Sequence, residues 1–290
     1  MFVQYLQYVI FGLVTGSILL LASTGFSMIR RTENFLNIAH GQFVALGAYF
    51  GYLFYMVVKL NLFLSIVLAI IAVAILGYVF NEIVFKPIRS YGGLYLLFTS
   101  VGLAYIVHGS IEGIFGTRPK AFLIAAPVQI SVAGYPLISS LEIIIIAVAA
   151  LSAVGLHLFL TRSRMGTAVR AMSSDYSLAG VRGINTNQVS TVVWILGSAL
   201  AGLAGVLLGI YGTVYSDMGW ALILLILSAT VLGGLGSIYG VMLGSVIIGL
   251  GMDLSVIVLN PAYRSAVAFV VIMVVLVFKP EGILGSGGSK

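Results

Sequence analysis

The sequence has no cysteine and very few charged residues. Only 8% of its 290 residues are Asp, Glu, Lys or Arg, against about 25% in soluble domains, and this deficit excludes a soluble fold. The lack of cysteine excludes disulfides and thiolate metal sites. No Gly-x-x-x-x-Gly-Lys-Ser/Thr phosphate loop, His-Glu-x-x-His helix or Gly-x-Ser-x-Gly elbow occurs. We therefore expect no catalytic residue, no metal site and no bound cofactor in this chain.

Long apolar runs fill most of the chain instead. Hydrophobic residues make up 61% of it and the mean hydropathy is +1.17. The runs are about 20 residues long, which is the length that a helix needs to cross a bilayer. Short alternating segments typical of a membrane β-barrel are absent. The composition therefore predicts an all-α integral membrane protein, a polytopic bundle in which the 35 glycines let helices pack closely.

The apolar pattern predicts about eight spans, some of them short or broken. The segment 220–238 ends in a glycine-rich stretch that makes a poor continuous helix, so 220–238 and 240–259 form either two full spans or a re-entrant pair. The nine apolar segments are 8–29, 36–58, 62–85, 93–115, 138–160, 187–210, 220–238, 240–259 and 265–278.

Lysine and arginine determine the predicted orientation. With the N-terminus outside and the C-terminus in the cytoplasm, ten basic residues lie on the inner side and four on the outer side, as the positive-inside rule requires. A loop at about 116–137 then lies outside, and its alternating residues suggest a small hairpin. A loop at about 161–186 lies in the cytoplasm. We expect one transmembrane domain over 1–284, followed at 285–290 by a flexible tail or added linker.

The cytoplasmic loop has a clear helical pattern. From Ser163 onward its apolar residues recur at three- and four-residue spacing, which predicts an amphipathic helix. Ser174-Asp175 favours a second short turn, and Gly183 favours a helix end. Asn185 followed by Gln188 resembles a cap for the next span. This helix either lies among lipid headgroups or docks a cytoplasmic partner in a groove.

Two breaks in the apolar pattern are candidates for the translocation path. At the first break a helix begins inside the membrane, where free backbone N–H groups need a cavity, water or partner side chains. Its polar residues either satisfy that backbone or contact substrate. Broken helices in transporters commonly line the path. The candidate path residues are Asn37, His40 and Gln42 at the first break, and Gly233, Gly234, Gly236 and Ser237 at the second.

Ionisable residues within the spans are few, and Asp253 is the only acid well inside one. This pattern fits a passive, largely apolar corridor and fits poorly with a proton- or sodium-coupled pump, which needs buried carboxylates. A separate small-residue face, formed by Ala201, Gly205 and Gly209, predicts close packing against another helix of this chain or of a partner.

Four stretches carry a family resemblance through their order and spacing. They are Gly12–Ser17, Leu36–Phe43 with Leu46–Tyr49, Gly183–Asn185 leading to Gly197–Gly205, and Val231–Ser237. On these stretches the chain from Gly12 to Gly285 resembles the membrane permeases of branched-chain amino acid ABC importers, in particular the H-type (Liv-type) subunit. Lys279–Gly282 resembles the usual family ending, whereas Arg30-Arg31 is a departure, because the family often has a hydrophobic or small pair there.

The resemblance implies a multi-pass protein of a bacterial-type inner (plasma) membrane that forms the path for Leu, Ile, Val or similar small amino acids by alternating access. The implied partners are two ATP-binding subunits that hold ATP and Mg²⁺, a second homologous permease, an extracytoplasmic binding protein and membrane lipid. Nucleic acid is not expected as a partner. The residues implied to contact the ATPase are Arg164, Met165, Gly166, Val169, Arg170, Met172, Asp175, Ala179 and Gly183.

Other functions stay open at this point. A permease of the same superfamily for urea or short amides shares these features. A stand-alone channel or secondary carrier would transport without any ATPase. A membrane enzyme would need a convergent catalytic set, which His40, His108 and Asp253 are too scattered to form.

Overall fold

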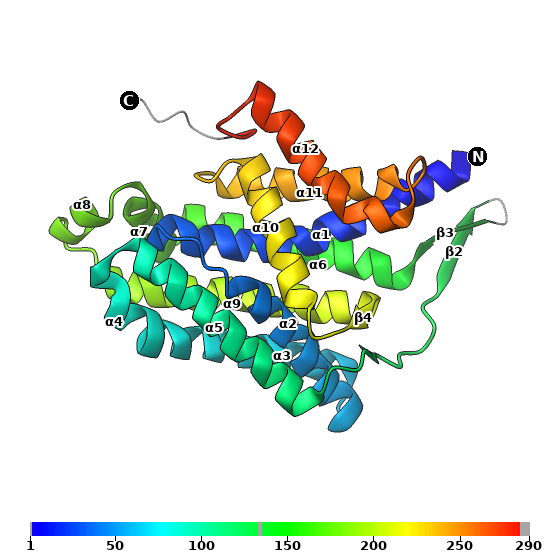
Figure 1. Ribbon diagram of the computed structural model, residues 1–290, viewed down its shortest axis with the longest axis horizontal. Helices are drawn as coiled ribbons and strands as arrows, with labels where there is room; N and C mark the ends of the chain where they lie inside the picture. The colour runs from blue at the N-terminus through cyan, green and yellow to red at the C-terminus, as the bar shows by residue number, and fades with distance from the viewer. Residues whose placement is uncertain (1, 133–134, 285–290) are drawn as a thin grey trace. The chain divides into compact units, whose positions relative to one another are not determined.

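The computed structural model describes residues 2–132 and 135–284, so the expectation for 285–290 lies outside the described residues (Figure 1). Within these ranges seven helical segments are long and apolar enough to cross a membrane, which confirms the polytopic all-α fold. They are α1 (Phe2–Glu33), the run α3 (Leu62–Phe80), η2 (Asn81–Phe85), α4 (Lys86–Ile88) and η3 (Arg89–Tyr91), then α5 (Gly93–Phe115), α6 (Ser140–Arg162), α9 (Thr186–Tyr211), α11 (Ile238–Ser255), and η4 (Pro261–Tyr263) with α12 (Arg264–Phe278).

The remaining helices are shorter. α2 (His40–Tyr52) continues through a π-helical turn, η1 (Leu53–Val57), and α7 (Arg164–Ser174) and α8 (Tyr176–Val181) occupy the predicted cytoplasmic loop. α10 (Met218–Gly233) has 16 residues, about 24 Å of helix, which is short for a bilayer core of about 30 Å. The glycine-rich end predicted at 233–237 therefore does separate a short helix from α11.

Two predicted boundaries were wrong. α1 does not stop near residue 29 but continues to Glu33, because Arg30 and Arg31 fall in its last turn, where basic side chains interact favourably with the helix dipole. Accordingly α2 begins at His40 and not at residue 36. The chain between the two helices is irregular, and Asn34 adopts a positive φ of 54° there.

The few strands form two small antiparallel pairs. β2 (Gln129–Val132) pairs with β3 (Tyr135–Ser139), which confirms the hairpin predicted from the alternating residues. β1 (Lys120–Ala121) pairs with β4 (Thr213–Val214), so the segment after α5 is joined to the segment after α9.

The chain divides into two compact units. Unit 1 consists of Met1–Thr24, Leu123–Ser152 and Leu224–Lys290, and unit 2 consists of Gly25–Phe122 and Ala153–Ile223. Three of the four boundaries fall within α1, α6 and α10, and the fourth lies between β1 and β2.

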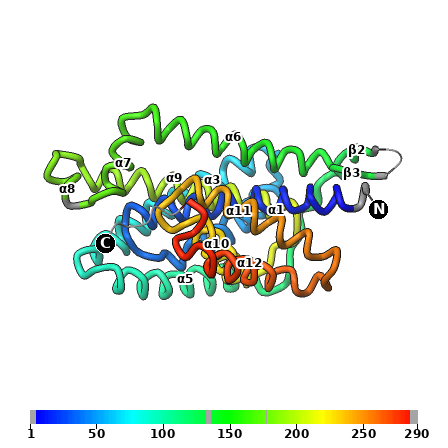
Figure 2. Tube along the Cα trace, turned by 90° about the horizontal axis from the view of Figure 1, so that it is seen from above, coloured from blue at the N-terminus to red at the C-terminus, as the bar shows by residue number. Residues whose placement is uncertain are grey.

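Unit 1 has an apolar core where the first part of α1, the end of α10, α11 and α12 meet. Its buried members are Leu19, Ala229, Leu232, Ile248, Met252 and Ala268. The hairpin joins the same unit, because the Gln7 side chain of α1 donates a hydrogen bond to the carbonyl of Pro136 in β3. Figure 2 shows the hairpin at the same end of this unit as the first turns of α1.

Unit 2 is built on α9, which packs against both α2 and α3. Trp194 of α9 lies at the centre, with its ring 4.7 Å from that of Phe85. Glycine lets the backbones of α2 and α9 touch. A Cβ added at Gly205 would overlap the Val44 carbonyl, and one added at Gly47 would overlap the Gly202 carbonyl.

Replacing Gly205 by alanine tests this contact. The added methyl group forces α2 and α9 apart, so we expect Gly205→Ala to destabilise the protein by about 1–3 kcal/mol, the usual cost of overpacking. Thermal unfolding of the purified protein in detergent measures the change. Gly109→Ala in α5 is the matched control, because a Cβ there has nothing within 4 Å. Equal melting temperatures for the two variants would contradict the packing argument.

Candidate functional site

The predicted cytoplasmic loop folds by local capping, as its sequence indicated. The hydroxyl of Ser163 accepts a hydrogen bond of 2.8 Å from the Gly166 amide and caps α7. Asp175 caps α8 by accepting from the Leu178 amide at 2.9 Å. Asn185 then caps α9, and Gly183 takes a left-handed φ of 82° between α8 and α9. The chain therefore makes two short helices and returns to the span.

The predicted coupling residues divide between two faces of these helices. Gly166, Val169, Met172 and Ala179 are buried, and α7 packs against α9 within unit 2. A Cβ at Gly166 would overlap the carbonyl of Phe159 in α6. The apolar face is thus covered by the chain itself, so the surface open to a partner is the polar one. The exposed coupling residues are Arg164, Arg170, Asp175 and Gly183, and Met165 is half-buried.

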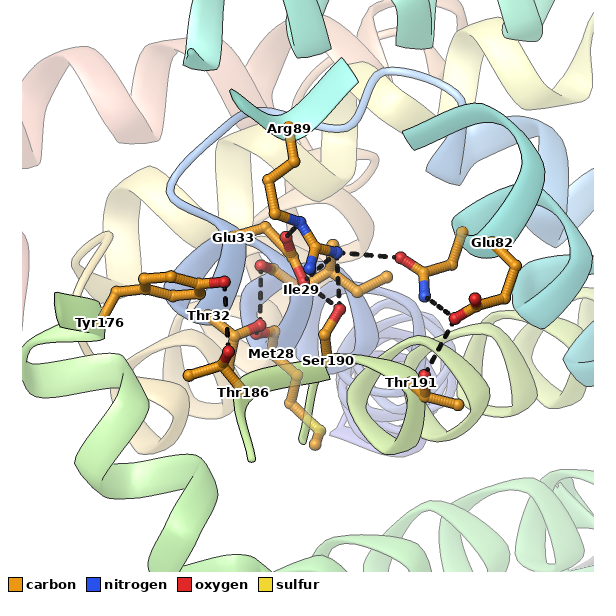
Figure 3. Close-up of polar contacts among 11 residues, drawn as sticks. Met28, Ile29, Thr32, Glu33, Glu82, Arg89, Tyr176, Thr186, Ser190 and Thr191 are labelled. Carbon is orange, nitrogen blue, oxygen red and sulfur yellow. Dashed lines mark hydrogen bonds and ion pairs between the residues drawn. The ribbon is translucent and has the colours of Figure 1, made fainter. Parts of the chain in front are cut away.

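A buried ion pair lies close to the start of α9 (Figure 3). The Arg89 Nε lies 2.9 Å from Glu33 Oε2, and their side chains are only 17% and 2% exposed. The Arg89 Nη2 also donates to Asn81 Oδ1 at 3.1 Å and to Ser190 Oγ at 2.7 Å. Ser190 in turn donates to Glu33. This network ties the end of α1 to η2, η3 and α9.

A second layer of polar contacts joins the network to an open hollow. Glu82 pairs with Lys86 at 2.6 Å and accepts a hydrogen bond from Thr191 at 3.2 Å. Lys86 and Thr191 also line a hollow of about 560 Å³ between α4, α7 and the start of α9. Tyr176 of α8 reaches Thr186 of α9 at 3.4 Å. The residues that line the hollow are Lys86, Met165, Asn185, Asn187, Gln188, Thr191 and Val192.

Sequence reasoning missed the Glu33–Arg89 pair. The two residues are 56 positions apart, and no local pattern links them. The available signal was an acid and a base, each at the end of a predicted span.

The first group of predicted path residues lies in unit 2. Asn37, His40 and Gln42 are all buried. The His40 ring lies 5.7 Å from that of Phe26 and 6.1 Å from that of Phe43. Both amide atoms of Asn37 and both of Gln42 have no hydrogen-bond partner among the residues that the structure describes.

The second group lies in unit 1, where the end of the chain closes the glycine break. The amides of Ile283 and Leu284 donate to the carbonyls of Leu232 and Gly233. A Cβ at Gly282 would meet the Gly234 backbone at 2.5 Å. Gly233 and Gly234 therefore pack against chain atoms. Gly236 has open space around its Cα, and Ser237 caps α11.

The predicted small-residue face of α9 is buried inside the protein. Ala201 is fully buried. Gly205 lies against Val44 and Ala48 of α2, and Gly209 lies against Phe122 and Val214. The helix partner of this face thus belongs to the same chain.

Charged groups elsewhere do not form a metal centre. In the described part of the chain no group of three or more His, Asp or Glu side chains is placed to hold a metal ion. His108 lies 3.7 Å from both Glu112 and Asp217. Asp253, the acid predicted inside a span, pairs with Arg264 at 2.7 Å in unit 1.

Residues 8–276 match the family described as branched-chain amino acid transport system / permease component. The chain belongs to this family. Together with the apolar spans, membership makes it the permease component of a transport system and a multi-pass inner-membrane protein, and the family's permeases are not enzymes themselves. No solved structure matches the chain.

Curated relatives match this permease along nearly the whole chain. The high-affinity branched-chain amino acid transport system permease protein BraD of Pseudomonas aeruginosa is 31% identical, covering 97% of this chain and 96% of the relative. The corresponding LivH protein of Escherichia coli K12 is 30% identical over 98% and 96%. A probable LivH of Methanocaldococcus jannaschii is 26% identical over 96% and 92%.

A double-mutant cycle on the buried pair tests the network of this permease. Arg89→Met leaves the Glu33 carboxylate buried and unpaired, so we expect a loss of about 3–5 kcal/mol in unfolding free energy. The double variant with Glu33→Met loses less than Arg89→Met alone, because no charge is left behind. Lys86→Met is the control, since the Lys86–Glu82 pair is exposed and such pairs contribute about 0–1 kcal/mol. Additive single effects in a denaturation series would contradict a direct pair.

Proposed function

We propose that this chain is the permease subunit of an ABC importer that carries leucine, isoleucine, valine or similar small amino acids inward by alternating access. The observation that carries the proposal is the similarity, over nearly the full length, to proteins named as high-affinity branched-chain amino acid permeases. The spans supply a path, and the sequence has no nucleotide-binding loop. The energy must therefore come from other chains.

The partners that complete this importer are two ATP-binding subunits, which hold the ATP and Mg²⁺, a second homologous permease and an extracytoplasmic binding protein. The N-terminus lies outside and the C-terminus in the cytoplasm in this proposal. That orientation places α7 and α8 in the cytoplasm, where the ATPases dock. It places the loop at 116–137 outside, where the binding protein docks.

The surface of α7 and α8 supports the docking role. The apolar face of α7 is buried against α9, so α7 is packed onto the span that follows the loop. Arg164, Arg170 and Arg182 are exposed there beside a single acid, Asp175. A surface with this excess of positive charge fits a partner with acidic side chains.

The ion pairs argue against the secondary-carrier alternative. A proton- or sodium-coupled carrier needs an ionisable carboxylate that can change its partner. Asp253 instead pairs with Arg264 at 2.7 Å, and Arg264 also donates to Thr15 at 2.7 Å. The Asp253 carboxylate is thus already occupied by a guanidinium within the same unit.

Affinity purification from native membranes in mild detergent, followed by identification of the co-purifying chains, is the first experiment. We expect ATP-binding subunits and a related permease. Reconstituted with them and the binding protein, the complex takes up labelled leucine only with ATP. A chain that purifies alone and transports without ATP would refute the proposal. Uptake of urea or acetamide in place of leucine would move the substrate assignment to short amides.

Charge reversal on α7 tests the docking surface. We expect Arg170→Glu to lower recovery of the ATP-binding subunits about tenfold, since one unfavourable charge at an interface costs on the order of 1–2 kcal/mol. Quantitative co-purification at low salt measures the change. Arg118→Glu, an equally exposed arginine between α5 and β1, is the matched control and retains wild-type recovery. Equal losses in the two variants would argue against docking at α7.

A further inference from the structure

The helix α2 begins deep inside unit 2. The Ile38 amide, two residues before the helix, donates a hydrogen bond of 3.1 Å to the hydroxyl of Ser100. Ser100 lies seven residues into α5, which begins at Gly93, and seven residues of helix rise by about 10 Å. The first turn of α2 therefore lies beside the membrane-spanning part of α5 and not at its end.

The helix α10 also begins beside the interior of α5. Asp217, just before its first residue, lies 3.7 Å from His108 of α5, and the Trp220 ring in its first turn lies 4.8 Å from that of Tyr105. Both partners lie several residues before the end of α5 at Phe115. Two helices of unit 2 thus start at positions flanked by a membrane span.

The two helix starts meet at glycines. A Cβ added at Gly41 in α2 would overlap the Gly219 carbonyl in α10, and one added at Gly219 would lie 2.5 Å from Gln42 Oε1 and 2.8 Å from Gln42 Nε2. The Gln42 amide therefore lies directly against the first turn of α10. A helix N-terminus has a partial positive charge, which favours an anion; at the start of α10 the Asp217 carboxylate, which is 74% exposed, already supplies one negative charge on the side facing His108.

Two side-chain amides of this segment, that of Asn37 just before α2 and that of Gln42 in its first turn, have no hydrogen-bond partner among the described residues. Asn37 and Gln42 are each 1% exposed, and none of their four amide atoms has a hydrogen-bond partner within the described ranges 2–132 and 135–284. A buried polar group without a partner destabilises a fold. Asn81 offers a comparison, because it is also 1% exposed. Its side-chain amide accepts a hydrogen bond from Arg89 and donates one to Glu82, so a buried amide with a structural role is paired in this protein.

We propose that Asn37 and Gln42 hydrogen-bond the carboxylate of the transported amino acid between the N-termini of α2 and α10. This inference rests on the proposed function and names the part of the substrate that the path recognises. The amide N–H groups donate to the carboxylate oxygens, and the helix dipoles favour the negative charge. Around the first turn of α2, Phe26 and Phe43 lie beside His40, and Ile223 lies beside Gly41; such apolar groups suit an aliphatic side chain. Neutral donors bind more weakly than a fixed cation, so the substrate can leave.

Transport and stability measured together test the site. We expect Asn37→Leu and Gln42→Met, in the full complex in proteoliposomes, to lower the initial rate of ATP-dependent leucine uptake at least about tenfold, as loss of a hydrogen bond to a charged group does. Their melting temperatures stay equal to or rise above that of the wild type, because an unpartnered buried amide is removed. Asn81→Leu is the matched control and melts lower, because its amide is bonded.

The outcomes separate this inference from the proposed function. A wild-type complex without ATP-dependent uptake would refute the proposed function itself. An active wild type with equally active Asn37→Leu and Gln42→Met variants would overturn the carboxylate site alone. The site is also overturned if both variants melt as low as Asn81→Leu, since the amides would then be structural.

A ligand comparison tests which group of the substrate is recognised. Leucine added to the wild-type complex in detergent raises its melting temperature by mass action, whereas leucinol, which has a hydroxymethyl group in place of the carboxylate, raises it much less. In both variants, leucine and leucinol change the melting temperature by the same amount. Equal protection by leucine and leucinol, or no protection by leucine, would overturn the assignment.

Discussion

Every backbone N–H and C=O group that lies in a bilayer must find a partner inside the protein, because no water is available to it there. Regular helices meet this requirement except at their ends. A helix that starts or stops at membrane depth is therefore the costly feature of this fold. The start of α2 and the end of α10 are two such places among the described residues, and their backbone groups are satisfied differently.

At the end of α10 the backbone groups are paired with the chain itself. The segment after α12 returns and donates from Ile283 and Leu284 to the last carbonyls of α10, and Ser237 caps α11. At the start of α2 the protein supplies side chains with more hydrogen-bonding capacity than the described residues use, namely Asn37 and Gln42. The second break, after α10, is thus closed by packing, whereas the first break, before α2, contains the side-chain amides of Asn37 and Gln42, which have no hydrogen-bond partner among the described residues. A transport path needs the latter, because its ligand comes and goes.

Capping signals were the part of the structure that the sequence predicted best. Asp175 and Asn185 each accept a hydrogen bond from an amide three residues ahead, as predicted, and such an interaction depends only on local geometry. The spans and the β2–β3 hairpin followed from composition and alternation for a similar reason. The end of α1 was misplaced because the apolar run ends at residue 29, whereas the helix continues through two arginines that a helix C-terminus accommodates.

Long-range pairing could not be predicted in this way. Glu33 and Arg89 are brought together by the packing of separate helices, and no spacing rule connects them. The burial of the apolar face of α7 has the same origin: periodicity identified the face, but only the fold shows that α9 covers it. Similarly, the amides of Asn37 and Gln42 were recognisable as candidates, while their lack of partners is a property of the packed structure.

In unit 2, α7 is connected to α2 through α9. α7 packs on α9, and α9 packs on α2 through glycines that leave the backbones in contact. Close-packed elements move as bodies and do not deform continuously. The Glu33–Arg89 pair adds a polar link from the end of α1 to the same helix α9. A displacement of α7 must therefore move α9, and α9 carries with it the helix whose first turn holds Gln42.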